Sequence, residues 1–133
     1  MSYEAFAYYY DSLMDQNFYN DYIQFINEHV KDYQTVLELG CGTGEIAIRL
    51  AHLGKQVCAT DISKDMLNEA KNKMQNDKKY SNRIDFIEYN LENIDCIETN
   101  KFDLSFNFHN VLGFVENPEK VISELYRVTK KSG

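Results

Sequence analysis

The sequence predicts an α/β protein with a doubly wound, mostly parallel sheet and helices on both of its faces, and three observations support this prediction. An apolar segment at residues 35–39 leads directly into a turn with glycines at positions 40, 42 and 44. A helical stretch starts at residue 45, and a second apolar segment ends at Asp61. Strands that alternate with helices in this way form βαβ units and therefore a parallel sheet.

The first half of the chain shows this alternation after two expected helices. Apolar periodicity places these N-terminal helices at about residues 4–14 and 20–30. Ser63 can cap a later helix, and Asp65 suits its first turn because the positive end of the helix dipole lies there. In order, we expect a strand at 35–39, a helix at 45–53, a strand at 56–60 and a helix from about 64 to 75.

The second half adds two more strands and one helix. Residues 84–89 alternate apolar and polar side chains and predict a third strand, and residues 102–107 predict a fourth. Asn117 followed by Pro118 and Glu119 indicates a helix start, since Asn caps, Pro fits the first position and Glu suits the first turn. The expected fold is therefore a Rossmann-like sheet of about four strands, preceded by two N-terminal helices.

Length and composition indicate one domain. A chain of 133 residues with 44% hydrophobic content can bury a single core but not two. We expect an N-terminal helical segment at residues 1–34 and a βαβ cofactor-binding core at residues 35–133. Apolar runs stop well short of the roughly 18 residues of a membrane helix. The N-terminus lacks the basic start and apolar stretch of an export signal, so we expect a cytoplasmic protein without a membrane partner.

Charge and metal-ligating residues limit the function further. The formal net charge of −7 disfavours a nucleic-acid partner, because binding to phosphate backbones needs clustered Lys and Arg. The three cysteines, at positions 41, 58 and 96, lack the spacing of a zinc site or a redox pair. The three histidines, at positions 29, 52 and 109, form no ligand pattern either. We therefore expect no metal site.

The spacing of the glycine turn favours one kind of ligand. A dinucleotide fingerprint needs a third glycine three residues after the second, and Glu45 occupies that position here. A carboxylate at the start of a helix would repel a pyrophosphate, which that end of the helix otherwise favours. Glu38, which precedes the first glycine, can face a cationic amino group. The turn therefore suits a nucleoside that carries a zwitterionic amino acid.

The pattern Glu38-x-Gly40-x-Gly42-x-Gly44, followed by Asp61 after the next strand, resembles the first motif and the acidic ribose-binding residue of class I S-adenosylmethionine-dependent methyltransferases. The resemblance implies S-adenosyl-L-methionine as the cofactor. Its methionine part would lie along Glu38, Gly40, Cys41 and Gly42, and Asp61 would accept hydrogen bonds from both ribose hydroxyls. Cys41 would line the pocket through its backbone, and for its thiol we expect a small residue that merely fits the turn over a reactive one.

The resemblance extends to four residues that would surround the adenine. Ile62 would pack on the base, with Met66 nearby and Leu91 on the opposite face. Asn90 would accept a hydrogen bond from the adenine amino group. Asn90 is an amide where the family often has an acid, which weakens but does not remove that hydrogen bond. Core packing is the alternative for Met66, and a loop start is the alternative for Asn90.

Three more residues complete the expected site. Tyr10, in a segment that looks like the start of small-molecule-type family members, would reach over the cofactor; an amphipathic ring that caps the sheet is the alternative. Asn107, at the end of the fourth strand, would contact the cofactor through its backbone. His109 is a candidate base, with a plain loop histidine as the alternative, so no catalytic residue is assigned.

The resemblance covers nearly the whole chain but only the N-terminal portion of the family fold. Residues 127–133 are similar to the element before the family's fifth strand, and the family adds three more strands after it. We therefore expect an incomplete sheet. Its fourth strand would be an exposed apolar edge, which indicates either a truncated chain or a homo-oligomer that covers this edge.

Three functions are compatible with these residues. The first is a methyltransferase, or its cofactor-binding half, that acts on a small molecule. The second is a non-catalytic module that binds S-adenosylmethionine. The third is an NAD-dependent oxidoreductase, which Glu45 disfavours.

The ribose assignment can be tested with a single substitution. We expect Asp61→Ala to cost roughly 2 kcal/mol of cofactor affinity, because a charge-assisted hydrogen bond is lost. Isothermal titration calorimetry with S-adenosylmethionine measures this difference. Unchanged affinity would contradict the assignment.

Overall fold

The computed structural model of this chain describes residues 16–30, 32–89, 97–99, 101–107 and 118–130. The expected helix at residues 4–14 lies outside these ranges. So do four residues singled out for the site, Tyr10, Asn90, Leu91 and His109, and the helix cap expected at Asn117.

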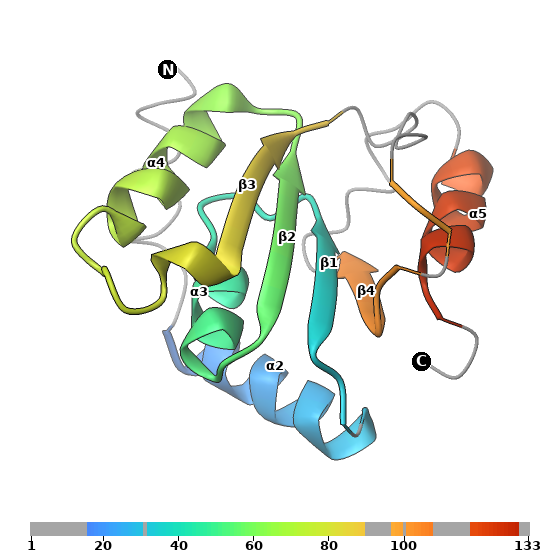
Figure 1. Ribbon diagram of the computed structural model, residues 1–133, viewed down its shortest axis with the longest axis horizontal. Coiled ribbons are helices and arrows are strands. Elements are labelled where there is room, and N and C mark those ends of the chain that lie inside the picture. The colour runs from blue at the N-terminus through green and yellow to red at the C-terminus, as the bar shows by residue number, and fades with distance from the viewer. Residues whose placement is uncertain (1–15, 31, 90–96, 100, 108–117, 131–133) are drawn as a thin grey trace.

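Four parallel strands form one sheet in the order β3-β2-β1-β4. Because β2 and β4 flank β1 on opposite sides, the strand order reverses next to β1 (Figure 1). In sheets of this kind the ligand lies outside the carboxyl ends of the strands at that reversal point. The strands are β1 (Thr35–Leu39), β2 (Gln56–Asp61), β3 (Ile84–Glu88) and β4 (Leu104–Asn107).

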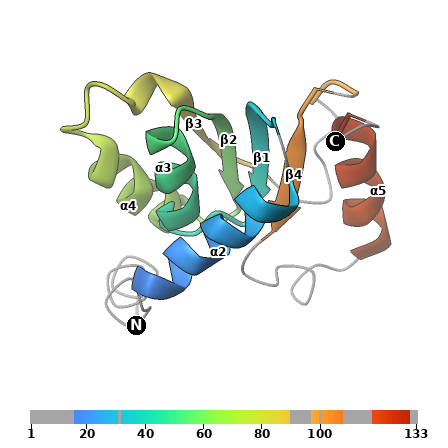
Figure 2. The ribbon, with the colours of Figure 1, turned by 90° about the horizontal axis from the view of Figure 1, so that it is seen from below.

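Helices cover both faces of the sheet, as a doubly wound fold requires. The helices α2, α3 and α4 lie on one side, and α5 lies on the other beside β4 (Figures 1 and 2). A short 3₁₀ turn, η1, leads into β3. The bounds are α2 (Gln16–His29), α3 (Glu45–His52), α4 (Lys64–Met74), η1 (Ser81–Arg83) and α5 (Pro118–Val128).

Strand β1 is buried on both faces, and its side chains alternate between two cores. Val36 packs in the core under α2, α3 and α4, whereas Leu37 and Leu39 pack in the core under α5. Successive side chains of a strand point to opposite faces, so Glu38 points to the same face as Val36. A carboxyl group therefore stands in the larger of the two cores.

The predicted elements that fall within the described residues agree with the observed ones, with small differences at several of their ends. Helix α2 begins at Gln16 instead of about residue 20, and β3 ends at Glu88, one residue early. Strand β4 begins at Leu104, not at residue 102, because Phe102 forms an isolated parallel bridge with Thr129. That bridge ties the end of α5 to the start of β4.

Within the ranges that the structure describes, none of the helices has the length and apolar character needed to cross a bilayer.

Gly44 of the glycine turn lies against side chains of α4 and β3. Its φ is +83°, and an added Cβ would stand 3.0 Å from the Cβ of Ala70 and 3.1 Å from the ring of Phe86. We expect Gly44→Ala to lower the free energy of unfolding by about 3 kcal/mol, from left-handed strain and overpacking together. Urea denaturation measures the change.

Gly54→Ala is the matched control. Its φ of +89° is similar, but nothing lies within 4 Å of an added Cβ. We expect a loss of about 1 kcal/mol from the left-handed conformation alone. Equal losses in the two variants would show that the contacts with Ala70 and Phe86 have no energetic weight.

Candidate cofactor site

The glycine turn folds back onto the carboxyl end of β2. The backbone N–H of Cys41 donates to the carbonyl of Thr60 at 2.8 Å, and the N–H of Gly44 donates to the carbonyl of Cys41 at 3.0 Å. Gly40 and Gly42 both have positive φ, 68° and 58°. This conformation, which side chains disfavour, lets the chain leave β1 and enter α3 within five residues.

Asp61, the last residue of β2, binds the glycine turn directly. One carboxylate oxygen accepts a hydrogen bond from the N–H of Gly42 at 2.9 Å, and the other accepts one from the N–H of Ser63 at 2.8 Å. A carboxylate oxygen can accept more than one hydrogen bond, so each retains capacity for a ligand hydroxyl. Asp61 is only partly buried and therefore open to such a ligand.

Glu38 is the most unusual side chain of the site. It is 0% exposed, and neither of its carboxylate oxygens has a hydrogen-bond partner among the described residues. Burial, and next the negative charge of Asp61, raise the pKa of Glu38 well above its ordinary value. The same carboxyl group also contributes to raising the pKa of Tyr22, after burial.

An unpaired carboxylate in a dry interior is costly, so the group favours its neutral form until a cation stands beside it. S-adenosyl-L-methionine carries a cationic amino group next to its carboxylate. Glu38 is therefore chemically suited to the amino end of this cofactor, and Asp61 is suited to the ribose.

Cys41 is a small, buried residue of the glycine turn. It is 2% exposed, and its thiol lies 3.6 Å from the carbonyl of Gly42, to which it donates. Burial, followed by the charges of Glu38 and Asp61, raises the pKa of the Cys41 thiol well above its ordinary value. Since the thiolate is the reactive form, these properties favour the interpretation that Cys41 simply fits the turn.

The remaining predicted residues differ in their access to a ligand. Ile62 is 63% exposed beside Asp61, where its side chain can cover one face of a base. Met66 is 7% exposed, so protein atoms already cover most of its surface. Asn107 ends β4 directly opposite Leu39, which puts its backbone at the strand reversal. The side chain of Asn107 lies outside the description.

The sequence analysis did not assign Thr43, Arg49 or Lys73 to the site, and all three lie around Glu45 in the structure. The ammonium group of Lys73, on α4, donates to the hydroxyl of Thr43 at 3.0 Å and to the carboxylate of Glu45 at 2.8 Å. The Arg49 guanidinium also binds Glu45. The i to i+4 spacing of Glu45 and Arg49 was a usable signal. The Lys73 contact crosses 28 and 30 residues and has no sequence signature.

These contacts change the argument about Glu45. Burial alone would raise the pKa of Glu45, but the hydrogen bonds and charges of Lys73 and Arg49 lower it below the ordinary value. Glu45 is thus ionised and paired with two cations, so it repels an anion less than an isolated carboxylate would. The case against a dinucleotide accordingly depends more on Glu38 than on Glu45.

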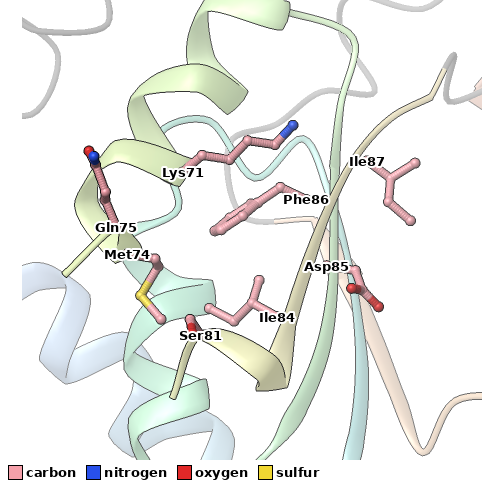
Figure 3. Close-up of a pocket in the computed structure, with 8 residues that line it drawn as sticks. All are labelled: Lys71, Met74, Gln75, Ser81, Ile84, Asp85, Phe86 and Ile87. Atoms are coloured by element: carbon pink, nitrogen blue, oxygen red, sulfur yellow. The ribbon is translucent and has the colours of Figure 1, made fainter. Parts of the chain in front are cut away.

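A groove of about 440 Å³ lies between α4 and the edge strand β3 (Figure 3). Figure 3 shows Phe86 pointing from β3 toward α4, with Lys71 lying beside it. The groove adjoins the glycine turn through Phe86, whose ring would stand 3.1 Å from a Cβ at Gly44, but its lining residues come from α4, η1 and β3 and include none of the turn. No group of three potential metal ligands gathers among the residues described.

The fold defines a class of protein, a Rossmann-like α/β domain, and the carboxyl groups near the ends of β1 and β2 suit a nucleoside cofactor that carries a cationic group. Residues 36–133 match the model of the methyltransferase domain family. The chain belongs to this family.

Two relatives match this chain along its full length. A protein of Geobacillus sp. (strain WCH70) with a provisional methyltransferase name is 32% identical over 141 residues. YqeM of Bacillus subtilis (strain 168), also named provisionally as a methyltransferase, is 32% identical over 136 residues. The alignments cover 100% of this chain but 55% and 53% of the relatives. The chain therefore spans about half the length of both relatives.

Solved structures agree with the family and the Rossmann-like fold. A protein of Methanococcus maripaludis, described provisionally as an S-adenosyl-L-methionine-dependent methyltransferase, has a TM-score of 0.67 and 31% identity, over 75% of this chain and 45% of its own. Phosphoethanolamine N-methyltransferase 2 of Haemonchus contortus, solved with S-adenosylhomocysteine, has a TM-score of 0.66 and 28% identity, over 73% of this chain and 22% of its own. These comparisons identify S-adenosyl-L-methionine as the cofactor, as the sequence resemblance implied.

The buried carboxyl group of Glu38 predicts a particular pH dependence of stability. A carboxyl pKa that folding raises stabilises the fold at low pH, and this contribution is lost as pH rises from the unfolded pKa to the folded one. Glu38→Gln is neutral at every pH. Without cofactor, we therefore expect the free energy of unfolding of Glu38→Gln relative to the unmodified protein to increase between pH 5 and pH 8.

Urea denaturation at both pH values measures this difference, and Asp85→Asn serves as the control because Asp85 is an exposed carboxylate on the same sheet. A Glu38→Gln difference that does not depend on pH would mean that Glu38 is ionised in the folded protein throughout this range.

Proposed function

We propose that this chain is the cofactor-binding domain of an S-adenosyl-L-methionine-dependent methyltransferase that acts on a small molecule. One observation carries the proposal: Glu38, a fully buried carboxyl group with no hydrogen-bond partner in the described part of the chain, lies beside a glycine turn that Asp61 holds through the N–H of Gly42. In this arrangement the Glu38 carboxyl group can bind a cation, and the Asp61 carboxylate at the edge of the sheet can accept hydrogen bonds from a sugar.

The cofactor supplies an electrophilic methyl group, so the protein needs mainly to bind, orient and keep water out. We assign Glu38 to the amino group of the methionine part and Asp61 to the ribose hydroxyls. The backbone of Gly40, Cys41 and Gly42 would line the methionine part. Ile62 would cover the adenine, since its side chain is exposed at the same edge.

Five further assignments stay predictions from the sequence. Met66 would complete the adenine pocket from within the core, and the backbone of Asn107 would border the cofactor at the end of β4. Tyr10, Asn90 and Leu91 lie outside the described residues. We also retain the division into a helical segment, 1–34, and a cofactor-binding core, 35–133.

The acceptor is proposed to be a small molecule because the net charge of −7 disfavours a polyanion. Relatives carry names with different acceptors. They include a malonyl-[acyl-carrier protein] O-methyltransferase of Buchnera aphidicola and a tRNA 5-carboxymethoxyuridine methyltransferase of Escherichia coli. A demethylmenaquinone methyltransferase of Leptospira interrogans is a third. The cytoplasmic location and a homo-oligomer through the edge of β4 likewise stay predictions.

Cofactor binding is the first test. We expect calorimetry to detect binding of S-adenosylmethionine and S-adenosylhomocysteine but not of NAD. Glu38→Gln should weaken the binding of both compounds by roughly tenfold. A hydrogen bond to a charged group contributes about 1.5–3 kcal/mol, and the amide of Gln retains part of that free energy. Asp85→Asn, on the far side of the sheet from β1, is the control. Preferential binding of NAD would overturn the proposal in favour of an oxidoreductase.

A turnover assay separates catalysis from binding alone. S-adenosylmethionine labelled on its methyl group is incubated with the protein and a pool of small metabolites, and transfer of label to a metabolite supports the enzyme. Tight binding without transfer to any metabolite would favour the alternative, a non-catalytic binding module.

A further inference from the structure

Helix α4 is linked to the glycine turn at three places: through Asp61 at its N-cap residue Ser63, and directly at Ala70 and Lys73. We infer that α4 sets the position of this turn and that Lys73 is a positioning residue for cofactor binding, acting through Thr43 and Glu45. The inference rests on the proposed function and adds to it a residue outside the known motif.

The first contact runs through Asp61. Its carboxylate joins the N–H of Gly42 to the N–H of Ser63, and Ser63 caps α4 by accepting a hydrogen bond from the N–H of Met66 at 3.2 Å. The carbonyl of Ser63 also accepts from the N–H of Leu67 at 3.1 Å. The start of α4 and the middle of the glycine turn therefore share one carboxylate.

The second contact is steric. Ala70, in the middle of α4, lies so close to Gly44 that an added Cβ would stand only 3.0 Å from the Cβ of Ala70. The turn thus abuts the helix directly, and movement of α4 would displace it.

The third contact is the ammonium group of Lys73 in the last turn of α4. It donates to the Thr43 hydroxyl at 3.0 Å and to the Glu45 carboxylate at 2.8 Å. Thr43 is buried and precedes Gly44, while Glu45 is the first residue of α3. Lys73 therefore joins α4 to the point where the turn becomes a helix.

These contacts matter for the ligand because the turn must present its backbone to the cofactor at one fixed distance. Gly40, Gly42 and Gly44 all have positive φ, so the segment has few intrinsic restraints. Asp61 restrains it at Gly42, and Lys73 restrains it at Thr43 and Glu45. A charge-assisted pair that is partly buried is a strong restraint of this kind.

The test compares substitutions of two lysines of the same helix. Lys73→Met keeps an unbranched apolar stem and removes the ammonium group, and Lys73→Arg restores a charged donor. Lys71→Met is the matched control, because Lys71 is exposed on the same helix and, among the described residues, its ammonium group makes no hydrogen bond to the turn (Figure 3). Binding of S-adenosylhomocysteine is measured by calorimetry at a temperature where all variants are folded.

We expect Lys73→Met to raise the Kd for S-adenosylhomocysteine roughly tenfold, equivalent to the loss of one charge-assisted hydrogen bond network. Lys73→Arg should recover most of this loss, and Lys71→Met should stay within about twofold of the unmodified protein. In the ¹H–¹⁵N spectrum of the ligand-free protein, the amide signals of Gly42 and Gly44 should move in Lys73→Met and return in Lys73→Arg.

A Lys73→Met protein that binds as tightly as Lys71→Met, with unmoved glycine signals, would overturn the positioning role and leave the proposed function intact. An unmodified protein that does not bind S-adenosylhomocysteine would overturn both. If Lys73→Met does not fold, Thr43→Val takes its place, because it removes only the hydroxyl that Lys73 binds. The same tenfold rise in Kd and the same signal shifts are then expected, and their absence overturns the inference.

Discussion

The hydrogen bond between the N–H of Gly42 and the carboxylate of Asp61 is the contact on which the rest of the site depends. It joins the turn after β1 to the end of β2. These two strands are neighbours in the sheet. The second oxygen of Asp61 accepts a hydrogen bond from the N–H of Ser63, the N-cap residue of α4, so the same carboxylate also fixes the start of that helix. A residue expected to bind a ligand thus also organises the protein around that ligand.

Glu38 illustrates how function can oppose stability in this fold. Strand β1 is covered on both faces, which is the usual condition for apolar side chains in a parallel sheet. A carboxyl group in that position finds no partner among the described residues, and burial disfavours its ionised form. Such a residue makes physical sense when a bound cation completes its environment. The neighbouring side chains Val36, Leu37 and Leu39 are fully buried, and the burial of their apolar surface contributes favourably to folding.

The reversal of strand order concentrates these features at one edge. The turn after β1, Asp61 at the end of β2 and Asn107 at the end of β4 all lie at the carboxyl ends of adjacent strands. Helix α4 approaches this edge from one face of the sheet, and α5 covers the opposite face (Figures 1 and 2). A helix that packs beside the turn can therefore influence the site without supplying a residue to its known motif.

The sequence by itself determined the order of the elements, the glycine turn, the Ser63 cap and the strand ends where Glu38 and Asp61 stand. All of these follow from local periodicity, glycine spacing and capping preferences, which neighbouring residues express on their own. Only the tertiary structure decided that Glu38 lacks a described partner, that Asp61 already holds Gly42, and that Lys73 reaches Thr43 and Glu45. Phe102 belongs with them, because its bridge to Thr129 shortens the predicted fourth strand. The physical reason is the same for these four features, because each depends on which distant segments pack together. Hydrogen bonds between residues 19 to 30 positions apart produce no pattern that local periodicity could detect.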